Sequence, residues 1–88
     1  MKVVFEASFA RDAKKKREKQ ILERVEQAIN NVKNADTLQD IKALNKLSGY
    51  DSYYRIRLGE YRIGIEVSGD EIIFVRILHR KDIYRYFP

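Results

Sequence analysis

The stretch YYRIRLGEYRIGI, residues 53–65, sets the architecture of the second half of the chain. Arg55 and Arg57 alternate with apolar residues, which is the period of a β-strand with one buried face. Gly59-Glu60 predicts a two-residue hairpin turn, and this turn places Arg57 opposite Arg62. Because like charges directly opposite each other destabilise a strand pair, we expect an anionic partner to lie against these arginines.

A third strand follows this hairpin. Alternation continues over residues 61–67, Ser68-Gly69-Asp70 predicts a turn, and residues 71–78 predict the last strand. A two-residue loop would turn Arg76 toward the core, where an unpaired charge is costly. We therefore expect all three residues to form the loop, which places Arg76 opposite Arg62. One sheet face then carries a row of arginines, namely Arg55, Arg57, Arg62 and Arg76.

The N-terminal half is mainly helical in pattern. Residues 2–5 predict a short strand, and Ser8 is a suitable N-cap for a helix that begins near Phe9. An apolar stripe with helical spacing follows and consists of Ile21, Leu22, Val25, Ala28, Ile29, Val32 and Ala35. The lysine-rich residues 14–19, between Phe9 and Ile21, fit either a break between two helices or a solvated turn within one long helix.

Thr37 predicts the start of a short helical turn that continues through Leu38, Ile41 and Leu44 and ends before Ser48-Gly49. Helices followed by a β-meander predict an α+β fold in which the helices cover one face of an antiparallel sheet. We expect residues 1–88 to form a single domain.

Composition narrows the classes of function. The 88 residues include 18 basic and 13 acidic side chains, a net charge of +5 that is compatible with a nucleic-acid partner. With no cysteine and one histidine, a metal site is not expected. No apolar run is long enough for a signal peptide or a bilayer span, so we expect a cytoplasmic protein without membrane contact.

The segment after the last strand, residues 79–86, contains the side chains best suited to proton transfer. His79 is the only side chain whose unperturbed pKa lies near neutrality, which suits a general base or acid, although a lone histidine is more often structural. Tyr84 can exchange a proton or stack on a base, and Arg80 and Arg85 are nearby cations. We expect Ile83 and Phe87 to anchor this segment by packing.

Taken together, these segments resemble the toxins of the RelE/ParE superfamily of type II toxin–antitoxin systems. The resemblance extends over nearly the whole chain and includes the N-terminal strand and helical pair. Its most specific parts are Lys46-Leu47-Ser48-Gly49-Tyr50, Tyr54-Arg55-Ile56-Arg57, Tyr61-Arg62-Ile63-Gly64 and His79-Arg80-Lys81-Asp82-Ile83-Tyr84. It implies a RelE-like domain with the order β-α-α-β-β-β and a short C-terminal segment.

RelE-like members are ribosome-dependent endoribonucleases, or mRNA interferases, that cut mRNA in the ribosomal A site. The resemblance implies this activity here, by metal-independent attack of a ribose 2′-OH and without a cofactor. It also implies three partners: the ribosome, mRNA and a cognate antitoxin protein that neutralises the toxin.

The resemblance also implies roles for particular residues. Arg62 would stabilise charge on the phosphate, Arg80 would act near the leaving group, and Tyr84 would orient or deprotonate the nucleophile. Because arginine is a poor proton acceptor, Tyr84 is the better candidate for the general base and His79 the second. The candidates for binding RNA or phosphate are Arg55, Arg57, Arg76, Lys81 and Arg85.

Two other functions remain open from the sequence. ParE-like members share the fold and poison DNA gyrase, so a gyrase inhibitor is the first alternative. The second is a non-catalytic module that binds nucleic acid or an antitoxin. In such a module the arginines would set the affinity and its salt dependence, whereas Tyr84 would not matter.

Overall fold

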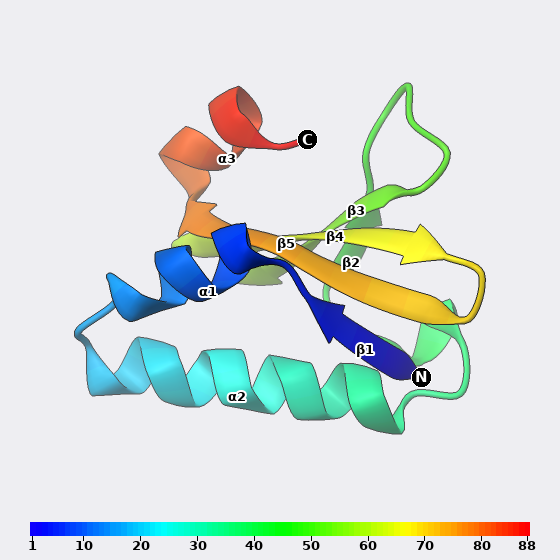
Figure 1. Cartoon of the computed structure of the whole chain (residues 1–88), viewed down its shortest axis with the longest axis horizontal. Helices are drawn as coiled ribbons and strands as arrows, with labels where there is room; N and C mark the ends of the chain where they lie inside the picture. Colours follow the sequence, from blue (N-terminus) through cyan, green and yellow to red (C-terminus); the bar gives the residue numbers. More distant parts are fainter.

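The computed structural model describes all 88 residues and has an α+β fold (Figure 1). The strands form one five-stranded sheet in the order β1-β5-β4-β3-β2. The elements in chain order are β1 (Lys2–Phe5), α1 (Ala7–Lys14), α2 (Lys19–Asn34), the short 3-10 helix η1 (Leu38–Asp40), β2 (Leu44–Lys46), β3 (Tyr53–Leu58), β4 (Tyr61–Ser68), β5 (Glu71–His79) and α3 (Arg80–Tyr86). The predicted fold class is confirmed.

The sheet is mixed, which corrects the expectation of a wholly antiparallel one. β1 pairs with β5 in parallel, with Val3 opposite Ile72, while the other pairs are antiparallel. The strand β2 was also not expected. Its three residues pair with β3, and the turn that begins at Thr37 includes only η1.

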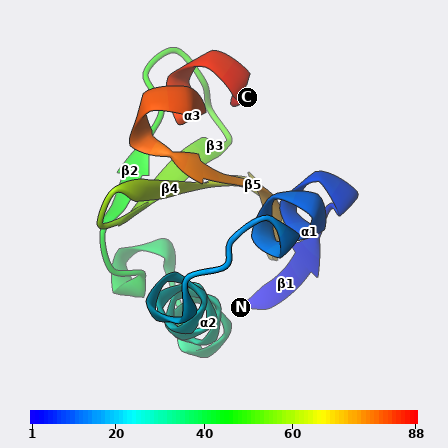
Figure 2. The same cartoon turned by 90° about the vertical axis from the view of Figure 1, so that its left-hand side faces the viewer.

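Two helices separated by residues 15–18 form the predicted helical region, so the lysine-rich segment is a break. α2 lies across one face of the sheet, as Figure 2 shows. It buries Ile21, Val25 and Val32 in the main core, whereas Leu22 of the predicted stripe is 40% exposed. The main core joins these residues to Phe9 of α1 and to the isoleucines and Phe74 of the central strands.

Helix α1 lies along the outer edge of β5, where β1 ends. It begins at Ala7, so Ser8 is not the N-cap that we expected. Instead, the Ser8 hydroxyl donates to the Val75 carbonyl at 2.6 Å, and the Ile77 N–H donates to Asp12 Oδ2 at 3.1 Å. Side chains of α1 therefore satisfy backbone groups of β5 beyond the reach of β1.

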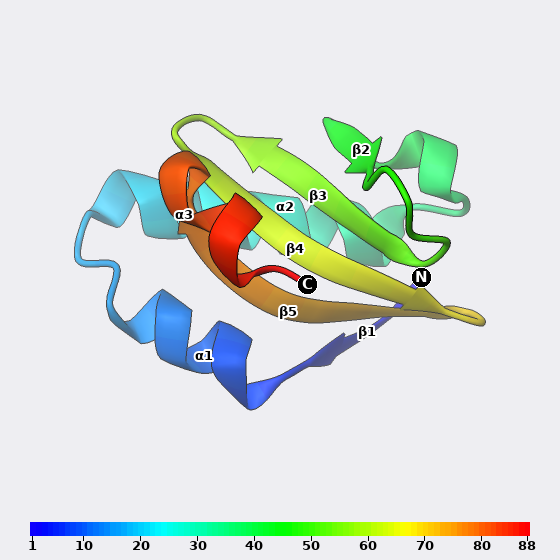
Figure 3. The same ribbon diagram turned by 90° about the horizontal axis from the view of Figure 1, so that it is seen from above.

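The β3–β4 hairpin has the predicted register. Leu58 lies opposite Tyr61 and Arg57 opposite Arg62, and Gly59 in the turn has a φ of 62° that favours glycine. Helix α3 lies on the face of the sheet opposite to the face that α2 covers (Figures 2 and 3).

The predicted β4–β5 register is wrong. Ser68 lies opposite Glu71, so the loop contains only Gly69-Asp70. The register then shifts between Gly64 and Ile65, where Val75 is an extra residue in β5, and this bulge restores the apolar phase. Arg76 consequently lies opposite Gly64 and not opposite Arg62. Because of this extra residue, the two-residue loop does not turn Arg76 toward the core, and no unpaired arginine is buried.

No helix of the structure is both long and apolar enough to cross a bilayer.

Candidate active site

A surface pocket of about 320 Å³ opens on the sheet face beside α3. It brings together side chains from β2, β3, β4 and α3, which lie far apart in the sequence. The residues that line it are Asn45, Arg55, Arg57, Arg62 and Tyr84. Four of these five residues are among the predicted site residues, and Asn45 is not.

The strand pattern places the arginines there. Arg55 and Arg57 are two residues apart on β3 and so extend from the same face. Arg62 is directly opposite Arg57 on β4, and its Nη1 donates to the carbonyls of Gly59 at 2.7 Å and Tyr61 at 2.8 Å. These bonds hold the Arg62 guanidinium at the turn and leave its other N–H groups for a ligand.

The pocket contains no carboxylate to balance these charges. The ion pairs of the protein join Lys2 to Glu71, Arg76 to Asp12, and His79 and Arg80 to Glu60. None of them involves an arginine of the pocket. Three guanidinium groups without an acidic neighbour favour an anion, and their planar forks suit phosphate oxygens.

Tyr84 closes the pocket from α3. Its residue is 71% exposed, and the Arg55 guanidinium carbon lies 4.4 Å from the centre of its ring. As predicted, Ile83 and Phe87 anchor the C-terminal segment: they are 0% and 4% exposed and pack with Leu47. Tyr84 is therefore held by its neighbours in the chain while its own ring faces solvent.

Gly64 explains how the anchor fits against the sheet. A Cβ atom at this position would lie 2.6 Å from the Phe87 ring, closer than real contacts allow. The Phe87 ring therefore packs directly on the bare backbone of β4.

His79 lies in different surroundings. Its Nδ1 accepts a hydrogen bond from the Lys81 N–H at 3.2 Å, which caps the start of α3. Its Nε2 lies 3.9 Å from Glu60 Oε2, and its ring meets Tyr61 edge-on. His79 thus lines a neighbouring surface pocket with Glu60 and Tyr61 and is not part of the arginine pocket.

The remaining basic residues of α3 also lie outside the arginine pocket. Arg80 Nε is 3.1 Å from Glu60 Oε2, and the Arg80 N–H donates to the Glu60 carbonyl at 2.8 Å. Lys81 and Arg85 are exposed on α3. Arg80 and Arg62 are nevertheless bound to the same turn, because Arg62 contacts Gly59 and Arg80 contacts Glu60.

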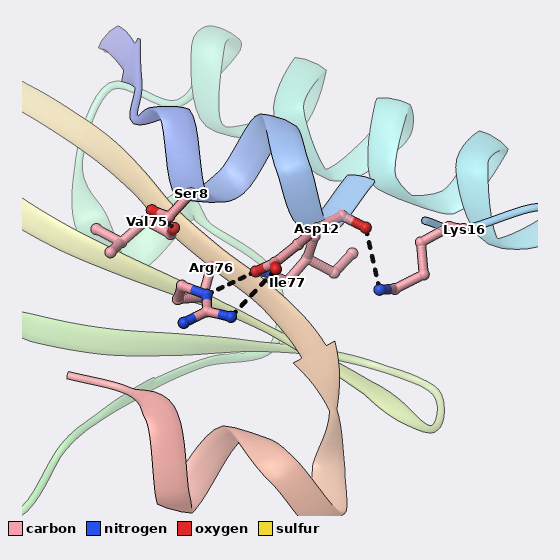
Figure 4. Close-up of polar contacts among 6 residues, drawn as sticks. All are labelled: Ser8, Asp12, Lys16, Val75, Arg76 and Ile77. Atoms are coloured by element: carbon pink, nitrogen blue, oxygen red, sulfur yellow. Dashed lines mark hydrogen bonds and ion pairs between the residues drawn. The ribbon is translucent and has the colours of Figure 1, made fainter. Parts of the chain in front are cut away.

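Arg76 belongs to the junction of α1 and β5 (Figure 4). Its Nε and Nη2 donate to the two carboxylate oxygens of Asp12 at 2.7 and 3.1 Å. The hydrogen bond to Asp12 raises the pKa of Arg76 above its ordinary value. Asp12 is buried, and it was missed although Ser8, Asp12 and Lys16 recur every four residues, the spacing of one helix face.

Asn45 was missed because β2 was missed. Its three residues, Leu44-Asn45-Lys46, are too few to show an alternating pattern. The side chain of Asn45 is directed to the pocket only because β2 pairs with β3, and the sequence carries no local signal for that pairing.

Comparisons with known proteins agree with this architecture. Residues 3–84 match a family model described as the ParE toxin of the type II toxin–antitoxin system parDE. The chain is 51% identical to Toxin RelE3 of Methanocaldococcus jannaschii, with all of both chains covered.

Two solved structures are similar as well. A RelB–RelE antitoxin–toxin complex from Methanococcus jannaschii contains a chain that is 48% identical, with a TM-score of 0.80 and with 97% of this chain and 99% of that chain covered. A RelE–RelB complex from Pyrococcus horikoshii OT3 has a TM-score of 0.72 at 19% identity, covering 90% of this chain and 93% of that chain, and so shows similarity of fold.

Proposed function

The chain belongs to the RelE/ParE family of toxins of type II toxin–antitoxin systems, and from this premise we propose that it is a RelE-like endoribonuclease that cuts mRNA on the ribosome. The observation that supports the proposal is the arginine pocket with Tyr84 at its side. The activity belongs to the cytoplasm, where mRNA is translated.

The pocket suits attack of a ribose 2′-OH on the adjacent phosphate. In this reaction the 2′-oxygen forms a bond to phosphorus, the 5′-oxygen leaves, and the phosphate oxygens gain charge in the transition state. Arg62 and Arg57 would stabilise that charge from two neighbouring strands. Arg62 needs little reorganisation, because two backbone carbonyls already hold its guanidinium.

Tyr84 is the group that would orient the 2′-OH and accept its proton. The Arg55 guanidinium carbon lies 4.4 Å from the centre of the Tyr84 ring, so this ring is held beside the arginines that would bind the phosphate. Arg80, released from Glu60, would stabilise the charge on the departing 5′-oxygen from the far side of the Gly59-Glu60 turn, and this oxygen would take its proton from water. The ribosome would supply the orientation of the RNA.

We also propose a cognate antitoxin as the partner of this chain, as in the RelB–RelE complex of the Methanococcus jannaschii relative. Two modes of neutralisation fit the site. An acidic segment would cover the arginine pocket, or the antitoxin would displace α3 and with it Tyr84.

Mapping of mRNA 5′ ends in a translating extract tests the proposed activity. Wild type should produce new ends within codons, and Tyr84→Phe should reduce them about 100-fold or more. Arg62→Ala should cause a comparable loss. Tyr86→Phe and Arg11→Ala are the matched controls, since both residues are exposed and lie outside the pocket. Full cleavage by the Tyr84 and Arg62 variants would contradict the proposal.

The second candidate is a ParE-like inhibitor of DNA gyrase, which the match to the ParE family model favours. It predicts intact mRNA, continued translation and accumulation of gyrase–DNA cleavage complexes. Intact mRNA with arrested translation would instead indicate a module that binds without cutting.

A further inference from the structure

Asn45 is the one residue lining the arginine pocket that is neither cationic nor aromatic. It is the middle residue of β2 and lies directly opposite Arg55 on β3, so both side chains extend from the same sheet face. Asn45 is exposed, and the side-chain hydrogen bonds within the protein all involve other residues. Its amide is therefore free to bind a ligand.

The chemistry of this amide differs from that of the three arginines. A guanidinium group only donates hydrogen bonds, whereas a side-chain amide presents a donor and an acceptor side by side. The edges of nucleobases present the same combination. Contacts to phosphate fix the position of a nucleic acid, but contacts to base edges distinguish its sequence. In this pocket only Asn45 has the amide pattern that such an edge requires.

Tyr84 offers a place for the base itself. Its ring is against Arg55 and its residue is 71% exposed, so ring surface remains open to a stacked base. Single-stranded RNA is commonly recognised by stacking of an unpaired base on an aromatic ring, together with hydrogen bonds to the base edge. Asn45 and Tyr84 line the same pocket and supply these two elements next to the phosphate-binding arginines.

We propose that Asn45 is a specificity-determining residue that recognises a base of the bound RNA through a bidentate hydrogen bond. Adenine is the expected base, because Asn pairs in bidentate geometry with its N6 donor and N7 acceptor, and cytosine and uracil carry no such donor–acceptor pair on the corresponding edge. The ligand class, RNA, rests on the proposed function.

Binding of short single-stranded oligo-A, oligo-C and oligo-U to the purified protein tests this inference. Wild type should prefer oligo-A by about tenfold or more. Asn45→Ala should remove this preference while its affinity for oligo-C and oligo-U and its salt dependence stay unchanged. Asn45→Asp, which keeps the shape but loses the donors, should also lose the preference. Asn30→Ala, an exposed asparagine on α2, is the matched control.

Equal preference for oligo-A in wild type and Asn45→Ala would overturn the inference. So would an equal loss of affinity for all three RNAs in Asn45→Ala, or the absence of RNA binding or base preference in wild type. Arg57→Ala provides the contrast, since loss of a phosphate contact should weaken binding to all three RNAs alike.

The 5′-end mapping separates this inference from the proposed activity. Asn45→Ala should spread the cuts over more codons than wild type does. A changed base preference without any cleavage by wild type would leave base recognition standing and remove the endoribonuclease. If wild type cleaves mRNA and Asn45→Ala cuts at the same codons, the endoribonuclease activity stands and base recognition by Asn45 is rejected.

Discussion

Arg76 on β5 and the arginines of the pocket on β3 and β4 differ in what balances their charge. Arg76 is paired in forked geometry with the buried carboxylate of Asp12, which also accepts the Ile77 N–H. Arg55, Arg57 and Arg62 have no acidic partner. The first arrangement holds α1 on the sheet, whereas the second leaves cationic groups available. The same residue type thus serves the fold in one region and a ligand in the other.

Removal of the balancing carboxylate should have the largest effect on stability. Asp12→Ala leaves Arg76 without its partner and the Ile77 N–H without its acceptor. We expect the free energy of unfolding to fall by about 3 kcal/mol or more, measured by urea denaturation. Asp51→Ala, at an exposed aspartate, is the control. A loss below about 1 kcal/mol for Asp12→Ala would show that the pair does not hold α1.

A methyl group at the base of the C-terminal anchor should have the next largest effect. Gly64→Ala places a Cβ against the Phe87 ring, so the ring has to move away from β4. We expect a loss of about 1–3 kcal/mol, faster hydrogen exchange in α3 and reduced mRNA cleavage. Adding Phe87→Leu to this variant should restore part of each. Unchanged hydrogen exchange in α3 would show that Gly64 does not determine the position of Tyr84.

Removing a charge from the pocket should change stability little and binding strongly. Arg57→Ala relieves the opposition to Arg62, so stability should stay within about 0.5 kcal/mol of wild type or rise. The slope of log affinity for single-stranded RNA against log salt should become shallower by about 0.7, the value for one phosphate contact. An unchanged slope would mean that Arg57 does not contact phosphate.

Lys16 should show the smallest effect. Burial lowers its pKa, although the nearby Asp12 opposes this. Because the folded pKa is below the unfolded value, the unfolded chain binds more protons between the two, and stability should rise with pH as 10.5 is approached. Lys16→Met removes the titrating group and should flatten this rise, while the loss of its hydrogen bond to the Asp12 carbonyl and of its contact with the Tyr61 ring offsets the relief of burial at neutral pH. Lys15→Met is the control, compared by thermal denaturation across pH.

The β3–β4 hairpin was predictable because its signals are local. The alternation around Arg55 and Arg57 and the Gly59-Glu60 turn lie within thirteen consecutive residues, 53–65, and they set the register of Arg57 against Arg62. The bulge in β5 was not predictable in this way. It depends on α1, where Ser8 and Asp12 satisfy the backbone of β5 and Asp12 pairs with Arg76.

The candidate site likewise contains residues that local sequence patterns predict and residues that they do not. Arg55, Arg57, Arg62 and Tyr84 meet in one pocket, as a row of strand residues followed by an anchored C-terminal segment suggested. Asn45 was not predicted, because a strand of three residues is too short to show an alternating pattern. The predicted position of Arg76 opposite Arg62 was wrong because of the bulge. The other predicted residues, His79, Arg80, Lys81 and Arg85, lie outside the pocket. The catalytic and binding roles of all these residues stay predictions.

The hydrogen bonds from α1 to the edge of β5 also affect self-association. β5 is the longest strand, at nine residues, and an uncovered strand of this length would be a template for pairing with another chain. β1 covers its first half, and the Ser8 hydroxyl and Asp12 carboxylate occupy bonding groups of its second half. The sheet ends instead in the short strands β1 and β2, of four and three residues. The carboxylate that neutralises Arg76 therefore also helps to protect the toxin from aggregation through its sheet edge.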